Sequence, residues 1–455
     1  MRKSLKTNCI LTLTLTIILL LMSCTTVNSE GYIPEGEGTM ENPYLTYSVE
    51  DLKRIGNDEE WILDKHYKMM NDIILEKPNE KESNWTPIGT FDAPFTGTFN
   101  GNGKVIFGMV IRKIPHDNKY IGLFSAISGE TAKIERLGLE NVNICLDLDT
   151  AVSAITGALV GINIGGTIKD CYSEGIITGG RNYTGGLIGA LVGSTVEGCY
   201  SKADIKDIGK KTVESAVGGL IGITVTINNG TPVIINRCYA TGNIYGTAYA
   251  GGLVGLAAGT TIIENCYAIG NITSQMALGG LVGTSSTLIK NCYFSGNLMG
   301  ERNITYKALD LPLAGEAGGI QSYLGVDDVT KNCVVLSRKI QSYGRTIGYL
   351  FTAEQVVEEA KIENNYILDD IEIIPLNDYK NEYLKSYISE KNKLKSKEEL
   401  TNQATYEELG WDFTGPDAVW EFSGNYKLPK LVGVGGQDEL ITPEHLLLYI
   451  LNIKP

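Results

Sequence analysis

The chain repeats a short apolar strand that opens on glycine and contains Leu with Val or Ile. Five such strands begin 28, 33, 33 and 28 residues apart, at Gly157, Gly185, Gly218, Gly251 and Gly279. Strand-sized apolar segments at this period, with no helical spacing between them, predict a solenoid in which each repeat is one coil of a parallel β-helix. One coil cannot bury its apolar side alone, so the coils must stack on one another.

A second segment, which ends in Cys-Tyr, lies between the glycine strands. Side chains alternate along a strand, so each cysteine and the tyrosine that follows it point to opposite faces. We therefore expect a buried ladder of free thiols at Cys171, Cys199, Cys238, Cys266, Cys292 and, in a weaker copy, Cys333. An outward ladder is expected at Tyr172, Tyr200, Tyr239, Tyr267 and Tyr293.

Charged residues before the cysteines show where the strand must bend. On a straight strand, Lys169 and Glu197 would face inward with the cysteines, and a dry core cannot hold such charges. The intervening positions carry residue types that permit a corner, namely Asp170, Gly198, Asn265 and Asn291. The paired glycines are expected to allow unusual dihedrals and close approach of stacked coils.

The two ends of the array need covers, because exposed strand edges recruit other chains. Residues 36–130 are expected to form an N-terminal cap and the first coils, including a short helix signalled by a Ser-x-x-Asp capping pattern. Residues 131–350 are assigned to the repeat array. Residues 351–432 are assigned to the last coil, a charged insertion and an irregular C-terminal cap rich in Trp and Phe, and residues 433–455 to a tail.

The N-terminus resembles a bacterial lipoprotein signal peptide. Basic residues precede an apolar run that stops at Cys24 and is shorter than the roughly 20 residues that a membrane-spanning helix needs. Residues 1–23 are then the signal peptide, Cys24 is the lipidated residue, bearing palmitate, and residues 24–35 are a linker. Acyl chains would hold the protein on a membrane of the cell envelope. Thr25 is not the aspartate that suggests retention at the inner membrane, so we expect the outer membrane, with surface exposure as an open possibility.

Composition and charge exclude some classes of binding partner and some kinds of site. The formal net charge of −14 over 455 residues repels a polyanion such as nucleic acid. The 3 histidines lie far apart and the cysteines form no CxxC pair, so the sequence indicates neither a zinc site nor a histidine-based nucleophile relay. We expect no metal and no cofactor.

Disulfides between coils are disfavoured because parallel side chains hold the S–S dihedral far from about 90°, although an exported location permits oxidation.

The glycine strands alternating with Asn-Cys-Tyr corners resemble the GLUG motif proteins of bacterial cell envelopes. The resemblance extends from "GEGTMENPYLTYSVEDLKRIG" and "NWTPIGTFDAPFTGTFNGNG" at the front to "YEELGWDF" and "YKLPKL" at the back, covering roughly residues 36–432. It implies a right-handed β-helix displayed on the surface in an adhesin-like role. In some relatives it implies a non-catalytic segment of larger immunoglobulin-cleaving metallopeptidases. The chain contains no H-E-x-x-H motif, so peptidase activity is not carried over.

The outward tyrosines offer flat apolar faces and hydroxyls that suit a sugar ring or a partner chain. Alternatively, they stack on one another and only shield the coil corners. We expect a monomeric, non-enzymatic surface rod that binds a glycan or a host or bacterial surface protein. The alternatives are a structural envelope spacer and, by analogy with other β-helices, a polysaccharide lyase or hydrolase. The last needs paired carboxylates, and the aligned positions Glu174, Lys202 and Thr241 keep no acidic pair on adjacent coils.

Overall fold

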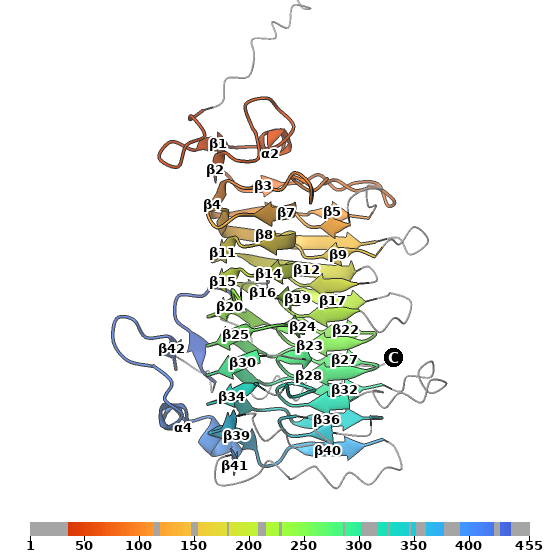
Figure 1. Cartoon of the computed structure of the whole chain (residues 1–455), viewed down its shortest axis with the longest axis vertical. Coiled ribbons are helices and arrows are strands. Elements are labelled where there is room, and N and C mark those ends of the chain that lie inside the picture. Colours follow the sequence, from red (N-terminus) through yellow and green to blue (C-terminus); the bar gives the residue numbers. More distant parts are fainter. Residues whose placement is uncertain are drawn as a thin grey trace, which may run out of the picture.

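The chain folds into a rod of parallel β-strands stacked along one long axis (Figure 1). The computed structural model describes residues 35–112, 119–146, 153–179, 182–207, 215–226, 230–284, 287–301, 316–325, 327–344, 347–351, 361–376, 392–422 and 428–437. Within these ranges, three parallel sheets named A, B and C contain 27, 6 and 8 strands. Successive coils contribute successive strands to each sheet, so the fold is the all-β parallel β-helix that the repeats predict.

One complete coil shows how the sequence repeat becomes structure. The chain passes through β18 (Ala216–Gly218) in sheet C and β19 (Ile221–Val225) in sheet B. It then crosses sheet A in three short strands, β20 (Val233–Asn236), β21 (Tyr239–Ala240) and β22 (Ile244–Gly246). The glycine strand of the repeat therefore forms the bend between sheets C and B, and the Cys-Tyr segment forms a corner within sheet A.

The other coils repeat this path. Sheet B also contains β7 (Phe124–Ser128), β10 (Val160–Ile164), β14 (Ile188–Val192), β24 (Val254–Ala258) and β29 (Val282–Thr284). Sheet C also contains β6 (Tyr120–Ile121), β9 (Ile155–Thr156), β13 (Tyr183–Gly185), β23 (Tyr249–Gly251), β28 (Ala277–Gly279), β33 (Glu316–Gly318) and β37 (Ile347–Gly348).

Sheet A receives up to three strands from each coil. The N-terminal coils contribute β1 (Tyr44–Thr46), β2 (His66–Met69), β3 (Ile73–Ile74), β4 (Thr98–Phe107), β5 (Val110–Ile111), β8 (Lys133–Cys145), β11 (Thr167–Lys169) and β12 (Tyr172–Gly179). The strands before the corner are β15 (Thr195–Glu197), β25 (Thr261–Glu264), β30 (Thr287–Lys290), β34 (Val329–Lys331) and β38 (Lys361–Glu363). Those just after it are β16 (Tyr200–Ser201), β26 (Tyr267–Ala268), β31 (Tyr293–Phe294), β35 (Val334–Val335), β39 (Asn365–Leu368) and β41 (Asn392–Lys395). The third position holds β17 (Asp204–Asp207), β27 (Ile272–Ser274), β32 (Leu298–Gly300), β36 (Lys339–Ser342) and β40 (Glu372–Pro375).

Aliphatic side chains fill the space between the sheets in columns, with one residue from each coil. Leu187, Leu220 and Leu253 form one column at the glycine bends, and Ile235 and Ile263 belong to another on sheet A. All of them are fully buried. Neighbouring coils pair in register, so each apolar side chain lies over its equivalent. Burial of these columns is the main favourable contribution to folding.

The paired glycines are required by close approach of the backbone. A Cβ atom at Gly219 would lie 2.1 Å from the carbonyl oxygen of Gly252 in the next coil, and one at Gly218 would lie 1.9 Å from that of Ile221. Neither glycine has a positive φ. The predicted close packing of coils is confirmed at these positions, whereas the prediction of unusual dihedrals there is wrong.

The corner before each cysteine adopts the left-handed conformation, as its residue types predict. Asp170 and Asn265 have φ of 51° and 54°, and Gly198 has φ of 64°. The reversal turns the preceding charged residue away from the cysteine. Lys169 and Glu197 consequently reach the surface and form an ion pair of 3.0 Å between neighbouring coils.

Asparagines at the corners, or just before one in the case of Asn236, also bond to each other from coil to coil. Asn265 Nδ2 donates to Asn236 Oδ1 at 3.0 Å, and Asn291 Nδ2 donates to Asn265 Oδ1 at 3.3 Å. Asn332 Nδ2 continues the series to Asn291 Oδ1 at 3.1 Å. An amide offers both a donor and an acceptor, so identical side chains can satisfy one another along the rod.

A short helix lies at the N-terminal end of the rod, α2 (Val49–Arg54), as the capping pattern predicts. The Ser48 side chain accepts a hydrogen bond from the backbone N–H of Asp51 at 3.2 Å, and the Asp51 carboxylate accepts one from the N–H of Ser48 at 3.0 Å. Leu52 and Ile55 are buried on the side facing the first coils.

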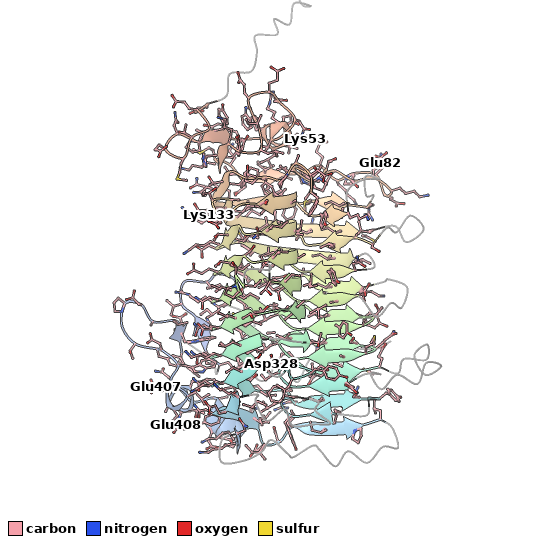
Figure 2. All side chains as sticks on the ribbon, viewed as in Figure 1. Lys53, Glu82, Lys133, Asp328, Glu407 and Glu408 are labelled. Atoms are coloured by element: carbon pink, nitrogen blue, oxygen red, sulfur yellow. The ribbon has the colours of Figure 1, made fainter. Side chains whose placement is uncertain are left out.

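The C-terminal segment lies along the flank of the rod. α3 (Lys397–Leu400) and α4 (Gln403–Glu408) follow β41, and Figure 2 shows Glu407 and Glu408 of α4 on this flank. The antiparallel pair β42 (Trp420–Glu421) and β43 (Lys430–Leu431) then runs back beside earlier coils (Figure 1). We call residues 411–422 and 428–437 the clasp.

The clasp is tied to coils far away in sequence. The guanidinium of Arg237 donates to the carbonyl oxygen of Val432, and Trp411 Nε1 donates to the carbonyl oxygen of Asn332 at 2.9 Å. The expectation that the C-terminal aromatic residues close the last coil is therefore wrong. They cover outward side chains on several coils instead, because those side chains present a large apolar surface.

The left-handed corners generate the first prediction. Replacement of Asn265 by Ala should destabilise the protein more than replacement by Gly, because both remove the amide bonds but only Ala is strained at φ of 54°. The difference should be about 1 kcal/mol, measured from urea unfolding midpoints. Equal midpoints for the two variants would contradict a strained corner.

Candidate functional site

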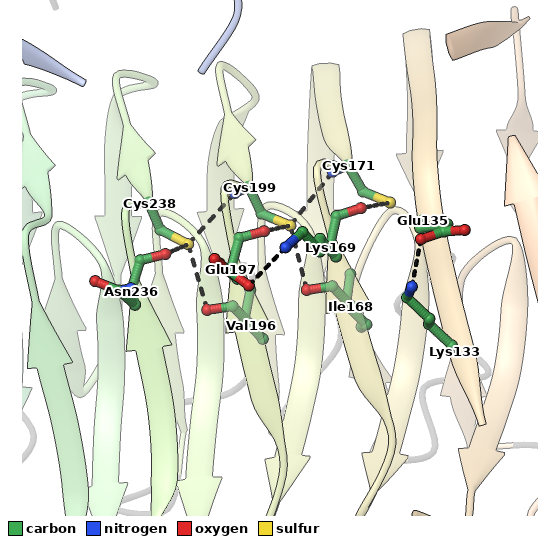
Figure 3. A network of polar contacts seen from close by, with 10 residues as sticks. All are labelled: Lys133, Glu135, Ile168, Lys169, Cys171, Val196, Glu197, Cys199, Asn236 and Cys238. Atoms are coloured by element: carbon green, nitrogen blue, oxygen red, sulfur yellow. Dashed lines mark hydrogen bonds and ion pairs between the residues drawn. The ribbon is translucent and has the colours of Figure 1, made fainter. Parts of the chain in front are cut away.

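The cysteine ladder lies inside the rod at the corners of sheet A. Its six cysteines are fully buried and free of disulfides, at Cys171, Cys199, Cys238, Cys266, Cys292 and Cys333. The Cys199 thiol contacts the carbonyl oxygens of Glu197 at 3.2 Å and Ile168 at 3.6 Å, and accepts the backbone N–H of Cys171 at 3.3 Å (Figure 3). Burial raises the pKa of the Cys199 thiol, which keeps it protonated as a donor. Each thiol thus forms hydrogen bonds with backbone N–H and carbonyl groups near the corner, where the strand is interrupted.

The tyrosine ladder runs along the outer face beside the cysteines. The rings of Tyr172, Tyr200, Tyr239, Tyr267 and Tyr293 stack with centroids 4.7 to 4.8 Å apart and interplanar angles of 2° to 4°. This separation equals the spacing of neighbouring strands, so the sheet imposes the stack.

The clasp covers most of this ladder. Tyr239 Oη donates to the carbonyl oxygen of Gly435 at 2.7 Å, Tyr267 Oη to Gln437 Oε1 at 2.9 Å, and Tyr293 Oη to the carbonyl oxygen of Pro429 at 3.0 Å. Trp420 packs over the same rings, with its centroid 6.4 Å from that of Tyr267 and 6.1 Å from that of Tyr293.

The hypothesis of an open binding stripe on the tyrosines is wrong for four of the five. Tyr200, Tyr239, Tyr267 and Tyr293 are between 0% and 7% exposed. Tyr172 alone is half-buried, and its hydroxyl donates to Glu140 at 2.6 Å. The tyrosines do point outward from the coil, as alternation predicts, but another part of the chain occupies the face that a ligand would need.

A different apolar surface remains partly exposed where sheets C and B meet on the outside of the rod. We call it the outer stripe, and its partly exposed members are Tyr120, Ile155, Ile164, Tyr183, Val192, Val225 and Leu256. They pack on the buried side chains of Ala126, Ile162, Ala190 and Ile223. In register, Tyr120 lies beside Ile155, which lies beside Tyr183. Phe91, which is 48% exposed, stacks on Tyr120 with ring centroids 5.1 Å apart.

The sequence does contain a signal for the outer stripe. Strands that follow the glycine bend are apolar at successive positions, as in Leu191-Val192, whereas a strand with one wet face should alternate. In the structure Ile188 and Leu191 point inward, while Val192 belongs to the outer stripe.

Two open hollows flank the N-terminal helix, with volumes of about 610 and 690 Å³. Both are lined by Lys53, Ser83 and Asn84, and Figure 2 shows Lys53 at this end of the rod. Asn84 is already fully engaged, because Nδ2 donates to the carbonyl oxygens of Glu76 and Gly108 and Oδ1 accepts the N–H of Val110. Asn84 therefore holds the loop together and is not available to a ligand.

Metal binding, membrane crossing and lipidation were the remaining questions about the site. Within the described ranges, His, Cys, Asp and Glu side chains do not gather in a group of three that could hold a metal ion. Each helix in the same ranges is too short or too polar to cross a bilayer. The predicted lipidation site, Cys24, lies outside the described residues, as do residues 208–214 and most of the tail.

The buried thiols generate a prediction about labelling. In the native protein, a maleimide should react with the half-buried Cys145 long before it reacts with Cys199 or Cys266. Unfolding in urea should make all of them reactive, as measured by peptide mapping. Fast labelling of Cys199 in the native state would contradict its position in the core.

The tyrosine ladder generates a prediction about alkaline pH. Burial raises the pKa of Tyr267 and Tyr293 well above 10, so the folded state favours the neutral phenol. Stability from these groups is complete below the unfolded pKa of about 10 and is lost as pH rises beyond it, because the unfolded chain ionises first. Phenolate absorbance of these residues should therefore appear together with unfolding. Replacing Tyr267 by Phe should reduce only this late phase, and a reduction in the phase near pH 10 would contradict its burial.

Comparison with known proteins places the repeat in a family. The family model described as the GLUG motif matches residues 246–273 and 274–299, and each match spans one coil with its glycine bend and its Cys-Tyr corner. A protein from Evansella cellulosilytica, described as a candidate Gly-rich membrane protein, is 36% identical over 133 residues, 29% of this chain and 14% of the relative. Halomucin from Haloquadratum walsbyi is 32% identical over 148 residues, 32% of this chain and 2% of the relative. The chain thus matches only a small part of each relative.

Two solved structures show weaker similarity. A candidate immunoglobulin A1 protease from Bacteroides ovatus aligns over 87% of this chain and 94% of its own, with 18% identity and a TM-score of 0.48. A second structure, named IgA1 Protease, aligns over 67% of this chain and 21% of its own, with 18% identity and a TM-score of 0.41. The chain therefore contains the GLUG motif in two adjacent coils of its parallel β-helix.

Proposed function

We propose that the chain is a cell-envelope protein that presents a non-catalytic β-helical rod for binding a partner at the bacterial surface. The apolar segment that ends at Cys24 supports a lipid anchor, most simply in the outer membrane. The relative described as a membrane protein supports an envelope location. The partner is a protein or a glycan, and the rod acts as a monomer.

The outer stripe carries this proposal. It is a contiguous row of aromatic and aliphatic side chains on the outside of a stiff rod, and surfaces of this kind mark interaction sites. Tyr183 of the outer stripe and Phe91, which stacks on Tyr120 at its edge, are best placed to contact a partner, because both aromatic residues are partly exposed. Aromatic side chains supply most of the binding energy at many interfaces.

Charge restricts the partner further. The net charge of −14 disfavours an acidic glycan or a strongly acidic protein. A neutral glycan, or a protein with a neutral or basic apolar face, is therefore the expected class. The tyrosine ladder does not contribute, because the clasp covers it.

The experiment compares binding of the chain from Thr25 onward to bacterial cells, host cells and a glycan array. The double variant Phe91→Ser and Tyr183→Ser should bind about tenfold more weakly, because both changes remove aromatic contact area. Ile176→Ser is the matched control, since Ile176 is 56% exposed but lies on β12 of sheet A, away from the outer stripe.

Equal loss in the control would contradict a role for the outer stripe. Absence of binding to every cell and glycan would contradict the proposal and leave a structural spacer. Release of reducing ends or unsaturated products from polysaccharides would contradict the non-catalytic role.

A further inference from the structure

Tyrosines recur on every second coil along the outer face of sheet C. Tyr120 pairs in register with Ile155, which pairs with Tyr183. Tyr183 in turn pairs with Ala216, which pairs with Tyr249. Neighbouring strands lie about 4.8 Å apart, so the three tyrosines follow one another at intervals of about 9.6 Å along the rod. We call Tyr120, Tyr183 and Tyr249 the alternating row.

All three side chains of the alternating row point outward. The residue that follows each tyrosine is fully buried, namely Ile121, Thr184 and Ala250, and successive side chains on a strand point to opposite faces. The tyrosines themselves are partly exposed, in contrast to the four that the clasp buries in the tyrosine ladder. Phe91 stacks on Tyr120 and extends the aromatic surface at the N-terminal end of the row.

The alternating row is held against an apolar layer. Tyr120 and Tyr183 pack on side chains that are between 1% and 7% exposed, Ala126, Ile162, Ala190 and Ile223. Ala190 is only 3% exposed although it lies on the outside of the rod, so larger neighbours must cover it. Tyr249 continues the row and packs against Ala248 and Met276. Packing of this kind fixes the rings before a ligand arrives and lowers the entropic cost of binding.

Aromatic rings at this interval match the repeat of an extended sugar chain. The ring of glucose has faces made of C–H groups, and these stack on the flat apolar face of an aromatic side chain. In a straight β-linked glucan, each sugar is turned over relative to the one before, so the same face recurs at every second sugar. The length of this two-sugar repeat is close to two coil spacings. An α-linked glucan curls and does not keep the repeat.

The surroundings of the row favour neutral sugars. The partly exposed members of the outer stripe carry no charge, and the net charge of −14 repels an anionic glycan. The sugars of chitin carry acetamido groups, which need hydrogen-bond partners when they are covered. The side chains of the outer stripe include no amide that could serve them. Glucose units are therefore favoured over N-acetylglucosamine units.

We propose that the alternating row binds one straight chain of β-linked glucose, which lies parallel to the axis of the rod. Each tyrosine stacks on every second sugar, and the aliphatic members of the outer stripe contact the sugars beside them. Four strand spacings separate Tyr120 from Tyr249, about 19 Å, so a chain of five sugars reaches all three rings. This inference rests on the proposed function, since it names the partner of the outer stripe.

The experiment titrates the full chain with three probes and follows the heat of binding. Cellohexaose should bind with a dissociation constant of about 1 mM or below. Cellotriose should bind about tenfold more weakly, because three sugars reach only two of the tyrosines. Maltohexaose is the matched control, since it is the α-linked isomer of cellohexaose. Equal affinity for the two isomers would overturn the proposal.

Variants at Tyr249 test the spacing. Tyr249→Ala should weaken cellohexaose binding about tenfold but leave cellotriose binding within about twofold, because cellotriose can still bridge Tyr120 and Tyr183. Tyr249→Phe keeps the ring and should keep the affinity. Tyr343→Ala is the control, since Tyr343 is 38% exposed but follows β36, three coils beyond Tyr249. Equal loss in Tyr343→Ala, or loss in Tyr249→Phe as large as in Tyr249→Ala, would overturn the assignment.

Failure of this inference can be told apart from failure of the proposed function. If the chain binds cells but not cellohexaose at about 10 mM, the glucan is overturned and the surface-binding role stands. If it binds neither cells nor any glycan, both are overturned. Tighter binding of chitohexaose than of cellohexaose would overturn the choice of glucose units.

Discussion

Each side chain in this rod must pack favourably against the equivalent side chain of the next coil. Parallel in-register pairing places the two directly over one another, one strand spacing apart. Leucine over leucine and isoleucine over isoleucine meet this requirement by packing. Tyrosine meets it by ring stacking at 4.7 to 4.8 Å. Asparagine meets it with an amide that is both donor and acceptor, as between Asn265 and Asn291. Charged residues meet it only when the sign alternates, as in the pair Lys169 and Glu197.

The same requirement explains how much of the fold could be predicted from the sequence. The repeat period, the inward cysteines and the left-handed corners all follow from local patterns that recur in each coil. Lys169 beside Cys171 cannot be accommodated without a corner, so the corner was predictable from two residues. The role of the paired glycines was only half predictable, because close approach at Gly219 depends on the neighbouring coil and not on its own φ.

The candidate sites were harder to predict, because they depend on contacts between distant parts of the chain. Tyr267 points outward as its position predicts, yet Gln437 lies over it, and nothing local to Tyr267 indicates that partner. The outer stripe shows the converse case, in which apolar side chains that are expected in the core lie on the outside. Val192 and Val225 look like core residues, but the two sheets bury them only partly on the outside of the rod.

The cysteine ladder ends in residues that contain no sulfur. Asn365 and Asn392 occupy the same slot in the last described coils, where Cys333 N–H donates to Asn365 Oδ1 at 2.8 Å and Asn365 Nδ2 donates to the carbonyl oxygen of Thr330 at 3.0 Å. These correspond to two of the three contacts that the Cys199 thiol makes elsewhere in the column. This position therefore requires a compact side chain that can both donate and accept a hydrogen bond. It does not require the redox chemistry of a thiol. A solenoid of this type built with amides alone would keep its corners and gain indifference to oxidants, which makes it a template for engineered rods outside the cell.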